Sequence, residues 1–185
     1  METQAPQLSG PSFRLFFTGF MGAGKSTVAQ LLSTHFQLPW LDTDRRIEQI
    51  MGIPVAQVFE RFGEEVFRQS ESQVLRDLDQ QSAVFIALGG GSLVRPGNLA
   101  RIQSLGRLVY LKAQPGVLWE RIQAQPQAPI RPWAQNGFEA FKQLLEQREL
   151  TYGAADWILP TDGKTPKQVV EWIAQEVLRK EMKVL

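Results

Sequence analysis

Nine consecutive residues near the start of the chain have the types and spacing of a phosphate-binding loop. The segment 19–27 matches the pattern Gly-x-x-x-x-Gly-Lys-Ser/Thr and follows an apolar run of strand length at 13–17. Its glycines let backbone N–H groups converge on phosphate oxygens, and the helix expected from Lys25 presents free N–H groups there. Lys25 lies at the positive end of that helix, which is unfavourable unless an anion fills the loop. These residues predict a nucleotide-phosphate site, with the Ser26 hydroxyl on Mg²⁺. A glycine-rich turn with an incidental lysine is the structural alternative.

Two carboxylates follow the second apolar run of the chain. Asp42 and Asp44 lie two residues apart, and in an extended segment both would point the same way. Like charges that close need a cation or a shared proton, and Mg²⁺ held by the phosphate-binding loop would supply the cation. Phosphoryl transfer to an alcohol also needs a carboxylate that orients the hydroxyl and accepts its proton. Helix capping by Thr43 or Asp44 is the alternative, but it accounts for only one of the two acids.

Three glycines and two arginines suggest a site for a small acid. The glycines at 89–91 follow the third apolar run and allow close approach by a ligand, although a tight turn would also use them. Arg68 lies one helical turn from Glu64 and Glu71, and Arg148 lies on an apolar helix stripe. A glutamate on the apolar face would hold Arg68 in one rotamer. Two guanidinium groups suit bidentate capture of a carboxylate, whereas an ordinary helix salt bridge is the alternative for either one.

The elements that must position these residues alternate between strand and helix. Strand-length apolar runs occur at 14–18, 39–41, 84–88, 108–112 and 157–159. Helical patterns occur at 25–36, 43–51, 55–62, 64–80, 98–104, 116–124, 138–152 and 166–182. This alternation predicts an α/β fold with a parallel sheet covered on both faces. In such sheets ligands collect at the carboxyl ends of the strands, where the loop, the aspartates and the glycines all fall.

Two segments are expected to lie outside the regular elements. The stretch at about 123–137 is polar and proline-rich, and so long a loop inside a compact domain predicts a lid. A kinase needs a lid to exclude water from the transferring group, and a mobile surface loop is the alternative. Residues 1–12 are expected to form a flexible N-terminal segment before a single domain at 13–185.

The composition excludes several functional classes. A net charge of +1 gives no general attraction to nucleic acid or to an acidic membrane surface. The lack of cysteine excludes a disulfide framework, a thiolate metal site and a cysteine nucleophile, and it fits a reducing compartment. No apolar stretch approaches a membrane span, and residues 1–12 lack the features of a secretory signal. We therefore expect a cytoplasmic protein that binds neither nucleic acid nor membrane.

Taken together, these motifs resemble the shikimate kinase family over nearly the full length of the chain. The matching segments are 19–27, 42–44, 47–52, 63–71, 89–91, 131–132, 148–152 and 155–156. The resemblance implies a three-layer α/β/α P-loop kinase fold with a five-stranded parallel sheet in the order 2-3-1-4-5 and a lid. It implies transfer of the γ-phosphoryl group of ATP to the 3-hydroxyl of shikimate, a step of chorismate and aromatic amino-acid biosynthesis. It also implies Mg²⁺ as cofactor, and we expect a monomer.

The resemblance assigns roles to individual residues. The residues expected to bind the nucleotide are Gly22, Ala23, Gly24, Lys25, Ser26, Thr27, Arg121 and Arg131. Those expected to bind the substrate are Asp44, Arg68, Gly90 and Arg148. The catalytic set is Lys25, Asp44 and Arg131, and the metal set is Ser26 and Asp42. Within these sets, Asp44 is the expected base, and Arg121 is expected to pack against adenine. Arg131 would swing from the lid to the phosphates, and a second adenine contact is expected around 164–166.

Two other classes of function remain open at this point. A gluconate kinase shares the P-loop, the fold and a hydroxy-acid substrate, but it is not expected to combine the segments 42–44 and 89–91 with Arg68. A kinase-like binding module that has lost catalysis is the second alternative. Such a module would be expected to have lost residues of the metal or base positions, yet Lys25, Ser26, Asp42 and Asp44 are all present.

Overall fold

The structure is a computed structural model that describes residues 13–82, 84–124 and 137–179. The predicted N-terminal segment 1–12 and nearly all of the predicted lid at 123–137, with Arg131, lie outside the described residues.

Five short strands form one parallel sheet in the order β2-β3-β1-β4-β5, as predicted. The strands are β1 (Leu15–Thr18), β2 (Trp40–Asp42), β3 (Phe85–Ala87), β4 (Arg107–Lys112) and β5 (Trp157–Pro160). In the central register Phe16 lies between Ile86 of β3 and Leu108 of β4, and all three are fully buried. A strand that is apolar at every position is expected where both faces of a sheet are covered.

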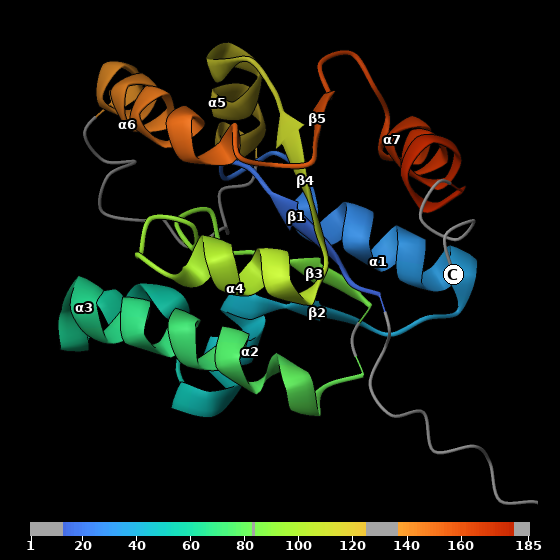
Figure 1. Cartoon of the computed structure of the whole chain (residues 1–185). Helices are drawn as coiled ribbons and strands as arrows, with labels where there is room; N and C mark the ends of the chain where they lie inside the picture. Colours follow the sequence, from blue (N-terminus) through green and yellow to red (C-terminus); the bar gives the residue numbers. More distant parts are fainter. Residues whose placement is uncertain (1–12, 83, 125–136, 180–185) are drawn as a thin grey trace, which may run out of the picture.

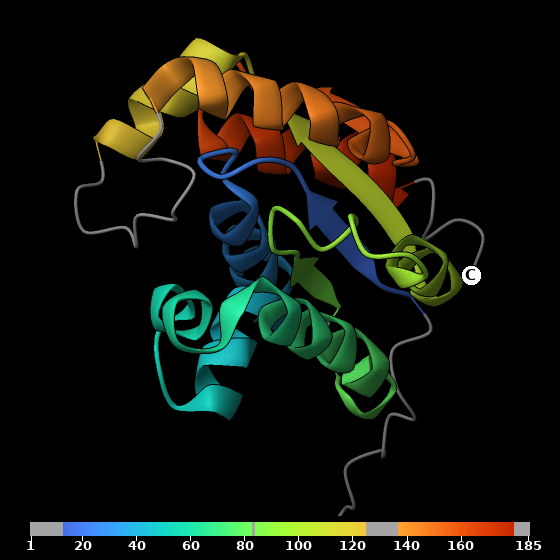
Figure 2. The same ribbon diagram turned by 90° about the vertical axis from the view of Figure 1, so that its left-hand side faces the viewer.

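Helices connect the strands and cover both faces of the sheet (Figure 1). The helices are α1 (Lys25–Phe36), α2 (Thr43–Met51), α3 (Val55–Arg76), α4 (Asn98–Leu105), α5 (Pro115–Gln123), α6 (Gly137–Tyr152) and α7 (Pro166–Trp172). A 3₁₀ turn, η1 (Asp77–Gln80), follows α3, and a π-helical segment, η3 (Ile173–Leu178), continues α7. Helices α1 and α7 pack against each other, and α3 and α4 do the same on the other side of the sheet (Figures 1 and 2).

Helix α3 contains the break that the sequence predicts between two helical patterns. Gly63 has φ 80° and ψ 174°, which are non-helical, and helical geometry resumes after it. Only glycine takes such a conformation at low cost. The second half of α3 runs beside α4, and its buried Arg68 and Glu71 lie against the segment that follows β3.

The carboxyl edge of the sheet collects the residues that the sequence marks as functional. The loop after β1 leads into α1, Asp42 is the last residue of β2, and the glycines 89–91 follow β3.

No helix in the described part of the chain is long and apolar enough to cross a membrane.

Candidate active site

The loop between β1 and α1 has the backbone geometry of an anion cradle. Gly22 and Gly24 have φ values of 80° and 87°, in the left-handed region that favours glycine. A side chain at Gly19 is excluded as well, since its Cβ would lie 2.7 Å from the carbonyl oxygen of Leu111. Because Gly24 precedes α1 and has no side chain to cap it, the first N–H groups of α1 remain available to an anion.

Lys25 and Ser26 direct their polar groups to different partners. The Lys25 ammonium donates to the carbonyl oxygen of Phe20, 3.0 Å away, so the side chain folds back over the loop. The Ser26 hydroxyl donates to Asp42 Oδ2 at 2.5 Å. A hydroxyl and a carboxylate in contact beside a phosphate cradle form an oxygen donor set of the kind Mg²⁺ prefers.

The two aspartates contact different groups, because the chain between them is not the extended segment in which both would point the same way. Helix α2 begins at Thr43, so Asp42 and Asp44 lie on either side of the strand-to-helix junction. Asp42 is the N-cap itself, because its Oδ1 accepts the N–H of Arg45 at 3.1 Å. Thr43 instead accepts the N–H of Gly89 at 2.8 Å and ties α2 to the triple glycine.

Asp44 lies directly against the first of the three glycines. A Cβ on Gly89 would be 2.5 Å from Asp44 Oδ1, 2.7 Å from Glu71 Oε1 and 3.1 Å from Ser92 Oγ. Real Cβ atoms do not approach oxygen this closely. Glycine at this position therefore makes the observed placement of the Asp44 carboxylate possible.

Arg68 is held by Glu71, as predicted, and also by Glu64, a second glutamate of the same helix. Its Nη1 donates to Glu71 Oε2 at 2.5 Å, and its Nη2 donates to Glu64 Oε1 at 3.0 Å. Burial lowers the pKa of Arg68, but Glu71 and Glu64 outweigh this effect, so the net pKa is raised. Arg68 therefore keeps its charge while only 8% exposed.

The sequence predicts the contact of Glu71 with Arg68, but it does not indicate the second contact that Glu71 makes with Ser92. Glu71 is 1% exposed, and burial raises the pKa of its carboxyl against the opposing effects of Arg68 and Ser92. Ser92 donates its hydroxyl to Glu71 Oε1 at 2.8 Å. The Arg68 guanidinium also lies against Gly91, where any Cβ would overlap it. The segment after β3 and the arginine therefore fix each other's position.

Arg148 reaches the same glycines from the other side. It lies in the last turns of α6, and its Nη1 donates to the carbonyl oxygen of Gly90 at 3.3 Å. Its guanidinium covers the ring of Phe20, with 5.2 Å between the Cζ atom and the ring centroid. Arg68 and Arg148 thus border consecutive glycines, so the structure brings together two arginines that lie 80 positions apart.

Tyrosines support this arrangement, and sequence reasoning did not identify them as part of the site. The buried Tyr152 donates its hydroxyl to the Gly90 carbonyl oxygen that Arg148 also contacts. Tyr110 of β4 packs beside it and donates to Glu149 at 3.2 Å. Burial raises the pKa of Tyr110, and the Glu149 carboxylate raises it further, so this phenol stays protonated. The only sequence signal for Tyr152 is its place on the apolar stripe of α6.

A separate pocket lies where the phosphate loop meets α5, the segment after β5 and α7. It has a volume of about 340 Å³ and is lined by Gly22, Ala23, Gly24, Thr27, Val28, Arg121, Thr161, Lys164, Pro166 and Val169. Arg121 forms one wall and donates to the carbonyl oxygen of Gly22 at 3.3 Å. The segment 164–166, expected to provide the second adenine contact, contributes two of the lining residues. This volume falls in the range of sites for small ligands.

The fold and this set of residues define a P-loop kinase that acts on a small acidic substrate. A phosphate loop after the central strand, a carboxylate beside it and an arginine pair lie at one edge of the parallel sheet.

Comparison with known proteins identifies the family. The shikimate kinase family model matches residues 21–179. A shikimate kinase of Lactococcus lactis subsp. cremoris (strain MG1363) is 40% identical over 88% of this chain and 96% of its own length. One of Caldanaerobacter subterraneus subsp. tengcongensis is 33% identical over 92% and 96%. The solved structure of the Acinetobacter baumannii shikimate kinase in complex with shikimate superposes with a TM-score of 0.83 at 28% identity, covering 91% of this chain and 95% of that one. The chain belongs to the shikimate kinase family. It is therefore an ATP-dependent phosphotransferase.

Proposed function

We propose that this chain transfers the γ-phosphoryl group of ATP to the 3-hydroxyl of shikimate, giving shikimate 3-phosphate and ADP. The observation that carries this proposal is the meeting of Arg68 and Arg148 at the triple glycine, beside Asp44. A small acid with hydroxyl groups needs a guanidinium pair for its carboxylate and an aspartate for its hydroxyls. A relative of the same fold was solved in complex with shikimate.

The substrate carboxylate is proposed to bind between Arg68 and Arg148, with the backbone of Gly90 as a third contact. Arg68 is held in place before the substrate arrives, because Glu71 and Glu64 fix its guanidinium. Preorganisation of this kind lowers the entropy cost of binding and sets the distance between the bound acid and the phosphate loop.

Asp44 is proposed to orient the attacking hydroxyl and to accept its proton as the new P–O bond forms. The bond from the γ-phosphorus to the bridging oxygen breaks at the same time, and the electron pair leaves with ADP. The proposal is supported by the contact of the Asp44 carboxylate with Gly89, which follows β3, the strand next to the one that leads into the phosphate loop. His35, the only histidine, is exposed in the last turn of α1 and is not part of this site.

The nucleotide is proposed to lie along the phosphate loop and into the pocket beside Arg121. The N–H groups of Gly22 to Thr27 and the Lys25 ammonium would hold the β- and γ-phosphates, where negative charge builds up during transfer. Arg121 would pack against adenine in the pocket of about 340 Å³. Arg131 remains a predicted catalytic residue of the lid, outside the described part of the chain.

Magnesium is proposed to bind at Ser26 and Asp42. The contact between the Ser26 hydroxyl and Asp42 supplies two oxygen ligands, and the described residues hold no cluster of three or more acidic, histidine or cysteine side chains. Such a sparse set fits Mg²⁺, which keeps several waters and takes its other ligands from substrate phosphates. When bound there, the ion neutralises charge on the transferring phosphoryl group.

We propose, as we expect from the sequence, that the protein acts as a monomer in the cytoplasm. The lack of cysteine supports the cytoplasm, because it fits a reducing compartment. Residues 13–185 are proposed to form one domain that carries its lid at 123–137.

The test is ADP release by the purified protein from ATP with shikimate, with gluconate or without an acceptor, each with and without Mg²⁺. Release that depends on both shikimate and Mg²⁺ is the expected result. Release with gluconate alone would transfer the chain to a different substrate class. Nucleotide binding without release for either acid would favour the binding-module alternative.

A further inference from the structure

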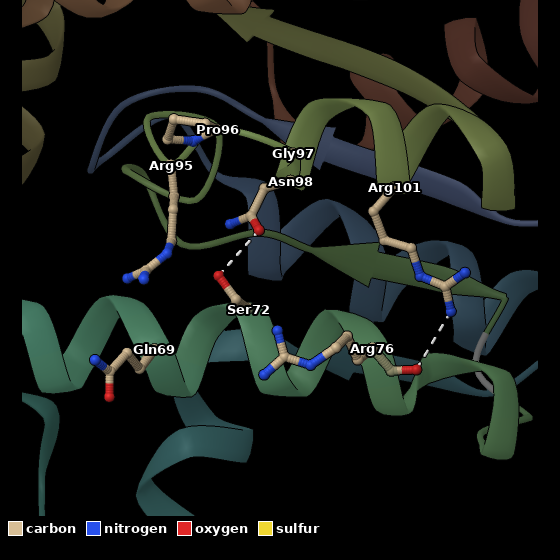
Figure 3. A pocket seen from close by; sticks show the side chains of 8 residues that line it. All are labelled: Gln69, Ser72, Arg76, Arg95, Pro96, Gly97, Asn98 and Arg101. Carbon is tan, nitrogen blue, oxygen red and sulfur yellow. Dashed lines mark hydrogen bonds between the residues drawn. The ribbon is translucent and has the colours of Figure 1, made fainter.

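A pocket in the groove between α3 and α4 takes no part in the proposed reaction. It has a volume of about 320 Å³ and is lined by Gln69, Ser72, Arg76, Arg95, Pro96, Gly97, Asn98 and Arg101 (Figure 3). None of these residues belongs to the nucleotide, metal or substrate sets. Three of the eight are arginines, which come from α3, from the loop before α4 and from α4 itself.

Two of the arginines extend toward the space above α3. In Figure 3 the side chain of Arg95 descends from the loop toward α3, and that of Arg76 runs back along α3 toward Ser72. Arg101 has a different task, because its Nη2 donates to the Arg76 carbonyl oxygen at 3.3 Å and to Asp79 at 2.5 Å. Arg101 therefore links the end of α3 to α4, which leaves Arg76 and Arg95 as the two arginines to consider for binding a ligand.

A carboxylate that does not itself line the pocket already accepts hydrogen bonds from two of the lining residues. Glu65 Oε1 accepts from Arg95 Nη1 and from Gln69 Nε2, each at 3.0 Å. The donors of two different elements thus converge on one carboxylate oxygen. The Glu65 side chain is 68% exposed, and exposed ion pairs of this kind contribute little to stability. An incoming anion can therefore replace the Glu65 carboxylate as the hydrogen-bond acceptor of Arg95 and Gln69 at a small cost in stability.

The contact of Arg76 is as easily exchanged as that of Arg95 with Glu65. Arg76 donates to Gln73 Oε1 on its own helix at 2.6 Å, a contact between exposed side chains. The floor of the pocket is firm by comparison, because Ser72 donates to Asn98 Oδ1 at 3.0 Å and Asn98 donates to the Ser92 carbonyl oxygen at 2.7 Å. Arg76 and Arg95 can exchange their exposed partners for a ligand, whereas Ser72 and Asn98 beneath them are held in place.

We propose that this pocket binds a small organic phosphate through Arg76 and Arg95, with Gln69 as a further donor. Guanidinium groups bind phosphate oxygens by paired, charge-assisted hydrogen bonds. The pocket volume is at the lower end of the range for small-molecule sites and exceeds what an inorganic phosphate alone would fill. The ligand is therefore a phosphate ester with a short polar carbon chain.

The test is a titration monitored by backbone amide NMR, on protein saturated with Mg·ADP and shikimate so that both parts of the candidate active site are filled. The probes are glycerol 3-phosphate and inorganic phosphate, with sodium chloride at matched ionic strength as the reference. Saturable shifts of the amides of Gly97 and Asn98 are expected, with tighter binding of glycerol 3-phosphate. Equal affinity for the two phosphates would overturn the assignment to an organic ligand, and the absence of saturable shifts would overturn the site.

Variants make the proposal specific to the two arginines. Arg76→Gln and Arg95→Gln should each weaken binding by roughly tenfold, as expected for loss of one charged hydrogen-bonded contact. Glu65→Gln should tighten it, because the competing carboxylate is gone. Arg107→Gln, at the start of β4, removes the same charge from a partly exposed side chain outside this pocket and should leave the affinity unchanged. Equal effects of all three arginine substitutions would reduce the result to general electrostatics and overturn the proposal.

Discussion

A methyl group at position 89 would collide with the carboxylate that we propose as the base. In Gly89→Ala the new Cβ would lie 2.5 Å from Asp44 Oδ1, whereas ordinary contacts begin at 3.4 Å. The backbone at Gly89 does not need the left-handed conformation, so the strain falls on the side chains. Glu71 is the other near neighbour, but Arg68 and Ser92 hold it in place. The new Cβ would still lie only 2.7 Å from Glu71 Oε1, so both carboxylates must shift, and Asp44 is the one that we propose takes part in the reaction.

The size of the effect follows from the displacement. Oδ1 must move by about 0.9 Å to restore a normal contact, and a misplacement of about 1 Å in a reacting group costs on the order of 100-fold in rate. We expect kcat of Gly89→Ala to fall by about two orders of magnitude. The affinity for ADP should stay the same, because the three atoms nearest to the new Cβ belong to Asp44, Glu71 and Ser92 and none belongs to the phosphate loop.

The assay is steady-state ADP release with shikimate, together with calorimetric titration of ADP and thermal unfolding. Gly116→Ala is the matched control, because a Cβ on Gly116 in α5 meets nothing within 4 Å. The control should retain the wild-type kcat. If folded Gly89→Ala also kept the wild-type kcat, Asp44 would not need its observed position, and its assignment as base would fail.

Three further substitutions test the remaining contacts. Asp44→Asn should abolish turnover and keep ADP binding, measured by ADP release and calorimetry; normal turnover would remove Asp44 as the base. Arg148→Ala should weaken shikimate binding by about 1.5–3 kcal/mol, the cost of one charged hydrogen-bonded contact, and an unchanged KM for shikimate would remove Arg148 from the site. Tyr152→Phe should raise the KM for shikimate several-fold with a smaller change in kcat, because it releases the Gly90 carbonyl oxygen beside Arg148. A loss of thermal stability with an unchanged KM would give Tyr152 a structural role only.

Local features of the fold were predictable because their causes are local. The predicted helices at 25–36 and 43–51 agree with α1 and α2 at both ends, since glycines and strand ends delimit them. The break at Gly63 was predictable because glycine interrupts the helical pattern there. The pair of Arg68 and Glu71 was predictable for the same reason, as both lie on one face of one helix.

The parts of the site that depend on packing between distant elements were not predictable from patterns. The contact of Ser92 with Glu71 joins a loop to α3, and that of Tyr152 with Gly90 joins α6 to the loop after β3. Neither pair has a spacing signal. The spacing of Asp42 and Asp44 was misleading, because the chain changes from strand to helix between them and sends the two carboxylates to different partners.

The position of the phosphoryl group on the product tests the central claim most directly. Incubation of the protein with Mg·ATP and shikimate, followed by phosphorus–proton correlation NMR of the isolated product, shows which carbon carries the phosphate. A phosphate ester coupled to the proton at C3 is the predicted result. An ester at another carbon, or no phosphorylated shikimate while ADP is still released, would contradict the proposed placement of the acid between Arg68 and Arg148.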